Sequence, residues 1–452
     1  MTDTLTRQLA DFAAHIAYQQ LPPEVIEQAK YVLLDALGCA IGAHKEDPRK
    51  ARIALDLATQ FGSTELSTLI GGRKAHPALA ALANGMLINA ADNDDTHKRA
   101  LIHVGSVIVP AALAVSEAEQ LDGKRLIEAL VAGYEITSRI GMAVMPTHYR
   151  FWHSTATNGT FGAAAAAAKA YSLDADLTLT ALGHAGTQAA GLNTFFESGD
   201  DTKSLHPGKS GMNGVLSALL ARLGASSPPD ILGHPKGYLA AFSTDPKPEA
   251  LTAGLGVHWE ILNNGFKPYP SILASHSPIG ATLSILAGHT IDPDTIASVA
   301  IETYATVKSH FSSKDVTTTM AARLSVPYCV AAALVDGTIG QDQFRPERFN
   351  APEIRRVLDK TEVSVDPELS PLYPEKFPAR VVVTLNDGTR HEALFLYPKG
   401  DPNNPLSRDE LIQKFRANVQ GVMPGQRSEQ IIATVLSLEN HTTNDLTRLL
   451  GH

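Results

Sequence analysis

Apolar residues recur at helical spacing along most of the chain, and this pattern predicts a succession of packed helices. Within residues 5–18, for example, Leu5, Leu9 and Phe12 fall on one helical face. The following segment, residues 24–43, is apolar nearly all round, which is typical of a helix buried among others. Further helices are expected at residues 48–62, 77–91, 107–120, 124–143, 163–171, 175–190 and 211–224. No sustained two-residue alternation interrupts them, so the first 265 residues are predicted to be all-helical.

The pattern changes after residues 267–270, Lys-Pro-Tyr-Pro, where alternating and β-branched runs begin. Strands are expected at residues 297–304, 363–365, 379–385 and 390–396, with helices at 273–288 and 325–336. The last two strands flank Asn386, Asp387 and Gly388, a sequence that predicts a β-hairpin. These elements indicate a smaller α+β domain with an antiparallel sheet over residues 268–398.

The tail from Ser407 returns to helical spacing, and we expect it to pack back on the helical domain. Residues 399–406 are rich in Pro, Asn and Gly and are predicted to be a linker. The predicted fold is therefore mainly α. A large, discontinuous all-helical domain at residues 1–267 and 399–452 is combined with the smaller α+β domain.

The amino-acid composition limits the classes of protein to which the chain can belong, but it does not indicate an activity. The 452 residues are 44% hydrophobic and 19% charged, as in an ordinary soluble globular enzyme. A net charge of −9 argues against a nucleic-acid partner. It also implies that an anionic substrate would be met by a local cationic pocket, because the overall field is negative.

The cysteines and the N-terminal sequence indicate which cellular compartment and which cofactors to expect. Cys39 and Cys329, the only cysteines, lie in apolar runs and are expected to be reduced core residues. Two cysteines cannot supply the ligands of a typical iron–sulfur cluster. The first residues lack a signal peptide pattern, and no long uninterrupted apolar run predicts a membrane span. We therefore expect a cytoplasmic protein without a membrane partner.

The densest polar segment of the chain lies at residues 92–106, between two Ala-rich apolar stretches. Its acidic residues and histidines are costly to bury unless they are paired or used in chemistry. One alternative is a solvated loop that caps a helix. Another is a divalent metal held by Asp92, Asp94 and Asp95, although His97 stands where a calcium loop needs glycine. No metal and no cofactor are therefore expected.

Lysines and histidines recur in other breaks between apolar segments: His103, His153, Lys203, His206 and Lys267. We expect these breaks to converge at one mouth of the helical domain. Such a pocket suits substrate carboxylates, which accept charge-assisted hydrogen bonds from lysine and histidine. The same residue types suit removal of a proton next to a carboxylate.

Five motifs in order together resemble the MmgE/PrpD family, which includes 2-methylcitrate dehydratase, cis-aconitate decarboxylase and iminodisuccinate epimerase. The motifs are residues 92–97 with His103, residues 162–168 after His153, and residues 203–208, 267–270 and 325–328. They extend over most of the chain. Val104 and Ser154 depart from the family, because proline is common at both positions.

The resemblance implies a metal-independent enzyme, usually a homodimer, with its active site between the two domains. It implies polar site positions at Asp92, Thr96, His103, His153, Lys203, Lys267 and Tyr328. His206, in the same motif as Lys203, is added as a candidate substrate-binding residue.

The resulting hypothesis is a lyase similar to 2-methylcitrate dehydratase that acts on a small di- or tricarboxylate. His103 or His153 would remove the proton α to a carboxylate, and Lys203 and Lys267 would hold carboxylate oxygens. Tyr328 or the second histidine would protonate the leaving hydroxyl, while a core position is an equal alternative for Tyr328.

Two residues of the hypothesis, Asp92 and Thr96, would orient the base or bind substrate. An epimerase with two opposed bases and a decarboxylase remain alternatives of the same class. A non-catalytic helical binding protein is an alternative of another class.

Overall fold

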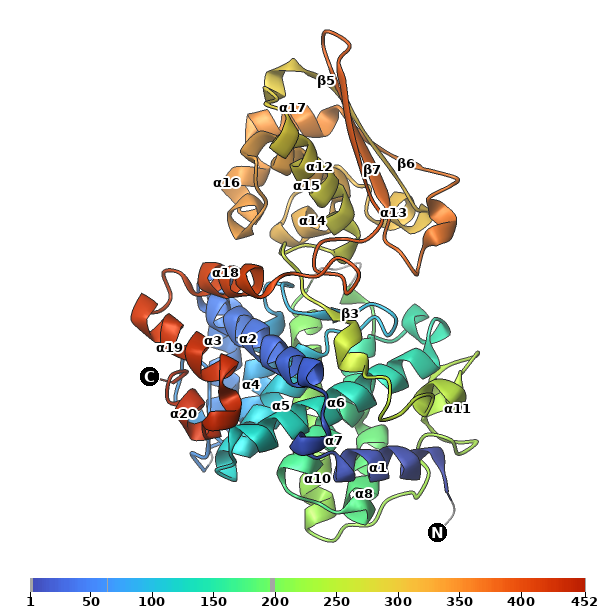
Figure 1. Ribbon diagram of the computed structural model, residues 1–452, viewed down its shortest axis with the longest axis vertical. Helices are drawn as coiled ribbons and strands as arrows, with labels where there is room; N and C mark the ends of the chain where they lie inside the picture. The colour runs from blue at the N-terminus through green and yellow to red at the C-terminus, as the bar shows by residue number, and fades with distance from the viewer. Residues whose placement is uncertain (1–2, 63, 196–199, 452) are drawn as a thin grey trace. The chain divides into compact units, whose positions relative to one another are not determined.

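The computed structural model describes residues 3–62, 64–195 and 200–451, which form two compact units (Figure 1). The larger unit comprises Met1–Phe266 and Ser407–His452, and the smaller comprises Lys267–Leu406. The predicted linker, residues 399–406, belongs to the smaller unit. Gly400 donates its N–H to the carbonyl oxygen of Asn404, which folds this segment into a turn.

The larger unit is a bundle of helices in which the Ala-rich segments lie at the centre. Its helices are α1 (Leu5–His15), α2 (Pro23–Glu46), α3 (Pro48–Gln60), α4 (Pro77–Asn89), α5 (Gly105–Ala118), α6 (Gly123–Val144), α7 (Ser154–Ala170), α8 (Ala175–Gln188), α10 (Thr202–Arg222), α11 (Tyr238–Phe242), α18 (Arg408–Val419), α19 (Gly425–Leu436) and α20 (Thr443–Thr447). Small residues let these helices approach closely. A Cβ atom at Gly162 of α7 would lie 2.6 Å from the carbonyl oxygen of Gly133 on α6.

Two helices begin earlier than the sequence pattern predicted. Helix α7 begins at Ser154 instead of residue 163, and α10 begins at Thr202 instead of residue 211. The Pro-Gly pair at residues 207–208 suggested a break, yet it lies inside α10. Pro207 lies inside the helix and removes one intrahelical hydrogen bond, so it does not end the helix. Gly208 packs so tightly that a Cβ atom would lie 2.2 Å from the Leu82 carbonyl oxygen.

Short antiparallel ladders also occur in the larger unit, where only helices were predicted. They pair β1 (Ser67–Thr68) with β2 (Lys74–Ala75), and β3 (Thr96–His97) with β4 (Asn264–Gly265). Two residues are too few to give a visible alternation in the sequence. The second ladder fixes part of the polar segment against a distant part of the chain.

The smaller unit contains a four-stranded sheet in the order β6-β5-β7-β8. Its strands are β5 (Ile296–Thr303), β6 (Thr361–Val365), β7 (Ala379–Leu385) and β8 (Arg390–Phe395). The predicted hairpin is confirmed as β7 and β8, with Ala379 opposite Phe395. However, β6 runs parallel to β5, so the sheet is mixed where an antiparallel one was expected. The chain between these strands passes through helices and can therefore return in the same direction.

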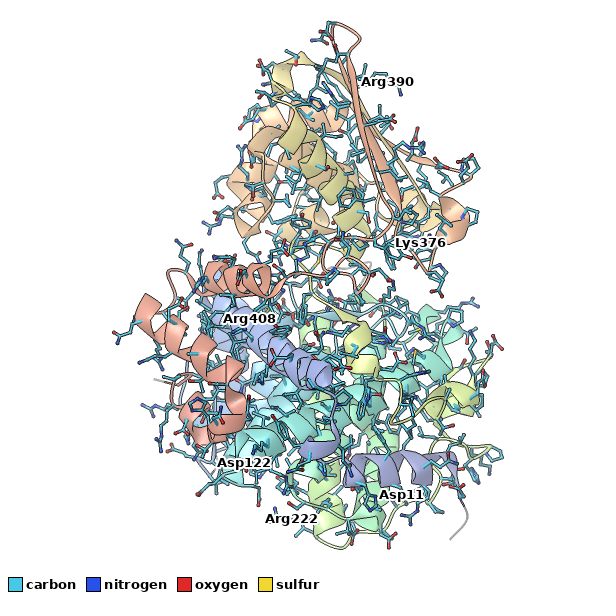
Figure 2. The ribbon with its side chains drawn as sticks, viewed as in Figure 1. Asp11, Asp122, Arg222, Lys376, Arg390 and Arg408 are labelled. Carbon is cyan, nitrogen blue, oxygen red and sulfur yellow. The ribbon has the colours of Figure 1, made fainter. Side chains whose placement is uncertain are left out.

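The helices of the smaller unit are α12 (His276–Gly288), α13 (Ala305–His310), α14 (Thr319–Leu324), α15 (Val326–Asp336), α16 (Pro346–Phe349) and α17 (Pro352–Asp359). Helices α12 and α15 pack together beside the sheet (Figure 1). The prediction of a mainly α fold with a smaller α+β part is confirmed. Charged side chains such as Asp122 and Arg222 lie at the outside of the larger unit (Figure 2). Within the described ranges, every helix is too short or too polar to span a bilayer.

Candidate active site

The polar segment that begins at residue 92 is buried in the larger unit, which excludes the solvated-loop alternative. Asp92, Asp94 and Asp95 are each at most 2% exposed, and His97 is fully buried. The segment follows directly on α4, and Asp92 adopts a left-handed backbone conformation with φ of 55°. Such a concentration of buried charge requires partners close by.

Asp92 joins two of the predicted residues from different elements. Its Oδ1 atom lies 2.8 Å from the Nζ of Lys203, on the first turn of α10, and 3.5 Å from the Nε2 of His103. The other ring nitrogen of His103, Nδ1, lies 3.4 Å from Asp94 Oδ1. Asn89 donates to both oxygens of Asp94 at 3.0 Å. The imidazole of His103 therefore stands between two fixed carboxylates.

Asp95 has a structural role at the start of α5. Its Oδ1 accepts the Gly105 N–H at 2.8 Å, and its Oδ2 accepts from the Tyr134 hydroxyl and the Asn264 amide, both at 2.6 Å. Burial raises the pKa of this carboxyl to about 7. Because its oxygens are occupied by these donors, Asp95 is part of the frame of the site.

His153 and His206 form a buried pair, with 2.9 Å between their Nδ1 atoms. One Nδ1 must donate the shared proton and the other must accept it. Burial lowers the pKa of both rings, to about 4 for His206 and well below the usual value for His153. His206, predicted to bind substrate, instead contacts His153, so its position favours an orienting role.

Electrostatic interactions connect the histidine pair to the Asp92 cluster. Burial is the main cause that lowers the pKa of His153. Nearby His206, His103 and Lys203 lower this pKa further, while Asp92 opposes them. These interactions require the groups to share one buried region. The structure therefore places Asp92, His103, His153, Lys203 and His206 in one region of the larger unit. Lys267, which was expected to converge with them, belongs to the smaller unit.

The remaining predicted residues have different surroundings. Thr96 lies on β3, and its buried hydroxyl has no hydrogen-bond partner within the described ranges. Lys267 is the first residue of the smaller unit and is 3% exposed. Tyr328, on α15, is fully buried in the core of that unit and donates its hydroxyl proton to the Gln343 carbonyl oxygen. Burial also raises the pKa of Tyr328, so the core interpretation is favoured over the catalytic one.

One contact between a histidine and an acidic residue was not anticipated from the sequence. His97 lies 3.1 Å from Glu260 through its Nε2, while its Nδ1 accepts the Ala100 N–H. Although burial opposes it, the hydrogen bond from His97 lowers the pKa of Glu260 to about 2. This pair stabilises the turn after β3. The partner of His97 is 163 residues away, and no local signal identifies it.

The acidic cluster also contains three residues whose side chains could bind a cation. Asp92, Asp94 and His103 place one ligand atom each within 4.8 Å of one another. This differs from the set considered from sequence, because Asp95 is engaged with Tyr134 and Asn264. A divalent ion here would be repelled by the ammonium of Lys203, which already lies 2.8 Å from Asp92.

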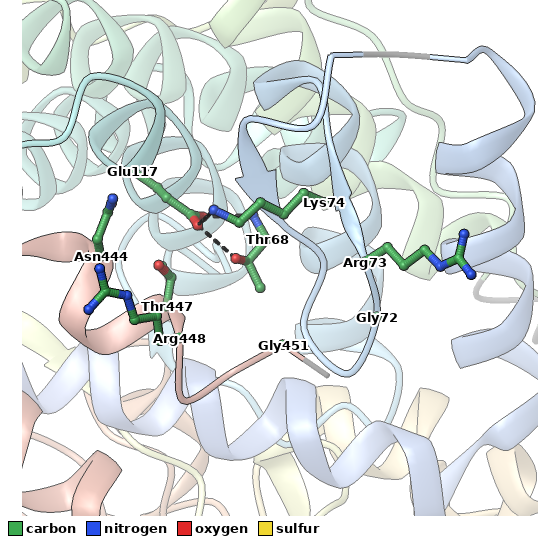
Figure 3. Close-up of a pocket in the computed structure, with 9 residues that line it drawn as sticks. All are labelled: Thr68, Gly72, Arg73, Lys74, Glu117, Asn444, Thr447, Arg448 and Gly451. Atoms are coloured by element: carbon green, nitrogen blue, oxygen red, sulfur yellow. Dashed lines mark hydrogen bonds and ion pairs between the residues drawn. The ribbon is translucent and has the colours of Figure 1, made fainter.

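A cavity of about 240 Å³ elsewhere in the larger unit contains none of these residues (Figure 3). Glu117 lies at its wall and accepts from the Thr68 N–H and hydroxyl, at 2.6 and 2.7 Å. Lys74 lies 2.8 Å from the same carboxylate. Since this carboxylate is already bound by three donors, the cavity offers no comparable arrangement of reactive groups.

Comparison with known proteins identifies relatives over the whole described chain. The sequence matches the MmgE/PrpD N-terminal domain over residues 7–251 and the MmgE/PrpD C-terminal domain over residues 269–440. It is 30% identical to the cis-aconitate decarboxylase-like protein oryM of Aspergillus oryzae, covering 99% of this chain and 96% of that protein. The cis-aconitate decarboxylases of Aspergillus terreus and Mus musculus are 29% and 28% identical, covering 95% and 94% of their lengths.

The neutral histidine pair predicts a pH-dependent part of the free energy of unfolding. The pKa of His206 is about 4 in the fold against 6.5 ordinarily, so between these values the unfolded state binds more protons. Its contribution is complete above pH 6.5 and is lost as the pH falls toward 4. We expect His206→Gln to flatten the slope of unfolding free energy against pH in this window, by up to about 1.4 kcal/mol per pH unit.

Urea unfolding at several pH values measures this slope. His15→Gln, which replaces an exposed histidine of the same unit, is the matched control and should keep the wild-type slope. An unchanged slope in His206→Gln would show that the ring is protonated equally in the folded and unfolded states.

Proposed function

Because the chain belongs to the MmgE/PrpD family and has a lyase-type role, we propose that it decarboxylates a small unsaturated tricarboxylate of the cis-aconitate class. The observation that carries the proposal is the buried cluster in which Lys203 and His103 share the carboxylate of Asp92. The relatives, which are named cis-aconitate decarboxylases, favour loss of CO₂ over the dehydration that the sequence hypothesis put first.

Lys203 is proposed to bind a substrate carboxylate. An ammonium group has three donors, and the structure uses one of them on Asp92 at 2.8 Å. The side chain is largely buried, so a carboxylate reaching it forms a charge-assisted hydrogen bond with little competition from water. Lys267 is proposed to bind a further carboxylate, as the family resemblance implies, and the hydroxyl of Thr96 is proposed as a neutral donor.

The two histidine environments favour different roles. His103 lies between Asp92 and Asp94, and two carboxylates are suitable charge partners for an imidazolium, so we assign it as the proton donor. His153 is buried beside positive groups and its pKa is lowered, so it is neutral near pH 7. We assign it as a hydrogen-bond partner of the substrate, oriented by His206.

In the proposed reaction the bond between the substrate chain and one carboxylate breaks, and CO₂ leaves. The electron pair of that bond forms a new double bond, and the electrons of the original double bond take a proton from His103 at its far carbon. Solvent returns the proton to His103, so one proton is consumed for each CO₂ released. Lys203 stabilises the negative charge that develops during this step.

Proton NMR in D₂O with cis-aconitate, 2-methylcitrate and iminodisuccinate tests the function directly. We expect cis-aconitate to lose CO₂ and its product to gain one deuterium, with the rate unchanged by EDTA. Loss of water from 2-methylcitrate alone would identify a dehydratase. Exchange in iminodisuccinate without net conversion would identify an epimerase.

No reaction with any of the three acids would favour a binding protein. A rate abolished by EDTA and restored by Mg²⁺ would assign Asp92 and Asp94 as metal ligands.

The assigned roles predict different kinetic effects for the two cationic residues. His103→Asn removes the proton donor and should lower kcat by about 10²- to 10⁴-fold. Lys203→Ala removes a charge-assisted hydrogen bond, and kcat/KM should fall by the equivalent of about 1.5–3 kcal/mol. Steady-state kinetics on the accepted substrate measures both changes. A Lys203→Ala enzyme with unchanged kinetics would contradict its assignment, and His258→Asn, at an exposed histidine, serves as the control.

A homodimer is proposed for the assembly, as the family resemblance implies. Leu216, Leu220 and Leu223 are 37%, 40% and 83% exposed, and their spacing places them on one face of α10 and its end. A stripe of exposed leucines is typical of a surface that another protein covers. Light scattering after size exclusion should give twice 48.1 kDa, and Leu220→Glu should lower the dimer fraction. A monomeric wild type would refute the proposal.

A further inference from the structure

Helix α18 contacts the polar segment through a lysine that the sequence hypothesis did not include. The side chain of Lys414 is 7% exposed, and its Nζ donates to Asp35 Oδ1 of α2 at 2.5 Å and to the carbonyl oxygen of Asn93 at 2.7 Å. Asp35 is also buried, so the two opposite charges compensate each other where water cannot. One ion pair therefore connects α2, α18 and the segment after α4.

The same residue of the segment is held a second time, one helical turn along α18. The side-chain amide of Asn93 donates to Asn418 Oδ1 at 3.2 Å. Together with the bond from Lys414, this anchors Asn93 by both its backbone and its side chain. Such a double anchor fixes the position of one residue far better than either bond alone would.

Two glycines of α2 allow α18 to come close enough for these bonds. A Cβ atom at Gly38 would lie 2.9 Å from Phe415 Cδ2, and one at Gly42 would lie 3.0 Å from the Asn418 carbonyl oxygen. Larger residues at either position would push α18 outward. Close contact with these glycines thus sets the distance between α18 and α2. This distance in turn fixes how far the Lys414 side chain must extend to contact Asp35 and Asn93.

The anchored residue stands between the two carboxylates that flank His103. Asn93 separates Asp92, which binds Lys203 and approaches His103 Nε2, from Asp94, which approaches His103 Nδ1. Asp92 has a φ of 55°, a conformation that most side chains avoid and that neighbouring contacts must maintain. Movement of Asn93 would therefore alter both contacts of the imidazole together.

We infer that Lys414 is a positioning residue of the active site, which holds Asp92 and Asp94 on either side of His103 through Asn93. It does not touch the reacting groups itself. The inference rests on the proposed function for its effect on catalysis, and on the contacts of Asn93 for its effect on His103. It also gives α18 a role in the site, although this helix lies 321 residues from Asn93 along the chain.

The test replaces the buried pair as a whole, since removing Lys414 alone would leave Asp35 charged and unpaired. The double variant Asp35→Asn/Lys414→Met removes both charges at similar volume. The control is Lys30→Met/Glu439→Gln, which removes another ion pair of α2, at 2.9 Å, that has no contact with the polar segment. Asn418→Ala removes the second anchor, together with the contact of its amide with Cys39 Sγ, and keeps the ion pair.

We expect the double variant to lower kcat on the order of 10²-fold with a smaller change in KM, because small displacements of catalytic groups are costly. The control variant should keep kcat even where its Tm falls equally. Asn418→Ala should give an intermediate loss. Wild-type kcat in a folded double variant would overturn the inference.

A second readout does not depend on turnover. The ¹H–¹⁵N signals of the His103 ring, assigned by their loss in His103→Asn, should shift in the double variant and stay in place in the control. If wild type turns over no acid, the proposed function fails while this measurement still decides whether Lys414 positions His103. Unshifted His103 signals in a folded double variant would refute the positioning role.

Discussion

The carboxylate of Asp92 is the interaction on which the candidate site depends. It is buried, so its charge needs polar partners close by, and these include Lys203 and His103 from separate segments of the larger unit. Removing either partner weakens the compensation of this buried charge. The early start of α10 and the left-handed turn after α4 both serve to bring these three groups together.

Two kinds of histidine environment lie within this one region. His103 is flanked by two carboxylates, whereas His153 and His206 share a proton and both lie beside the ring of Phe195. Burial lowers the pKa of both His153 and His206, which keeps these two rings neutral near pH 7. Residues of one type thereby have different surroundings, and this difference underlies the proposed division between proton donor and hydrogen-bond partner.

Close helix packing makes these distances achievable. Glycines at the crossings of α6 with α7, of α4 with α10 and of α2 with α18 allow backbones to approach to contact. The Ala-rich stretch of α7 extends the same dense packing around the site. A core of small residues gives little room for adjustment, so the polar groups that it surrounds are held in defined positions.

The sequence by itself determined the presence of most helices of the larger unit, the hairpin of the smaller one and the family, and it supplied the candidate residues of the site. These features depend on local periodicity, on turn chemistry or on ordered motifs, which are all visible along the chain. Only the tertiary structure decided that α10 begins at Thr202, that β6 is parallel to β5, and that Tyr328 lies in a core. It alone showed that His206 supports His153 and that Lys414 holds Asn93. The physical reason is that burial and the pairing of polar side chains bring together residues far apart in the chain. The local spacing of residues in the sequence does not predict such partners.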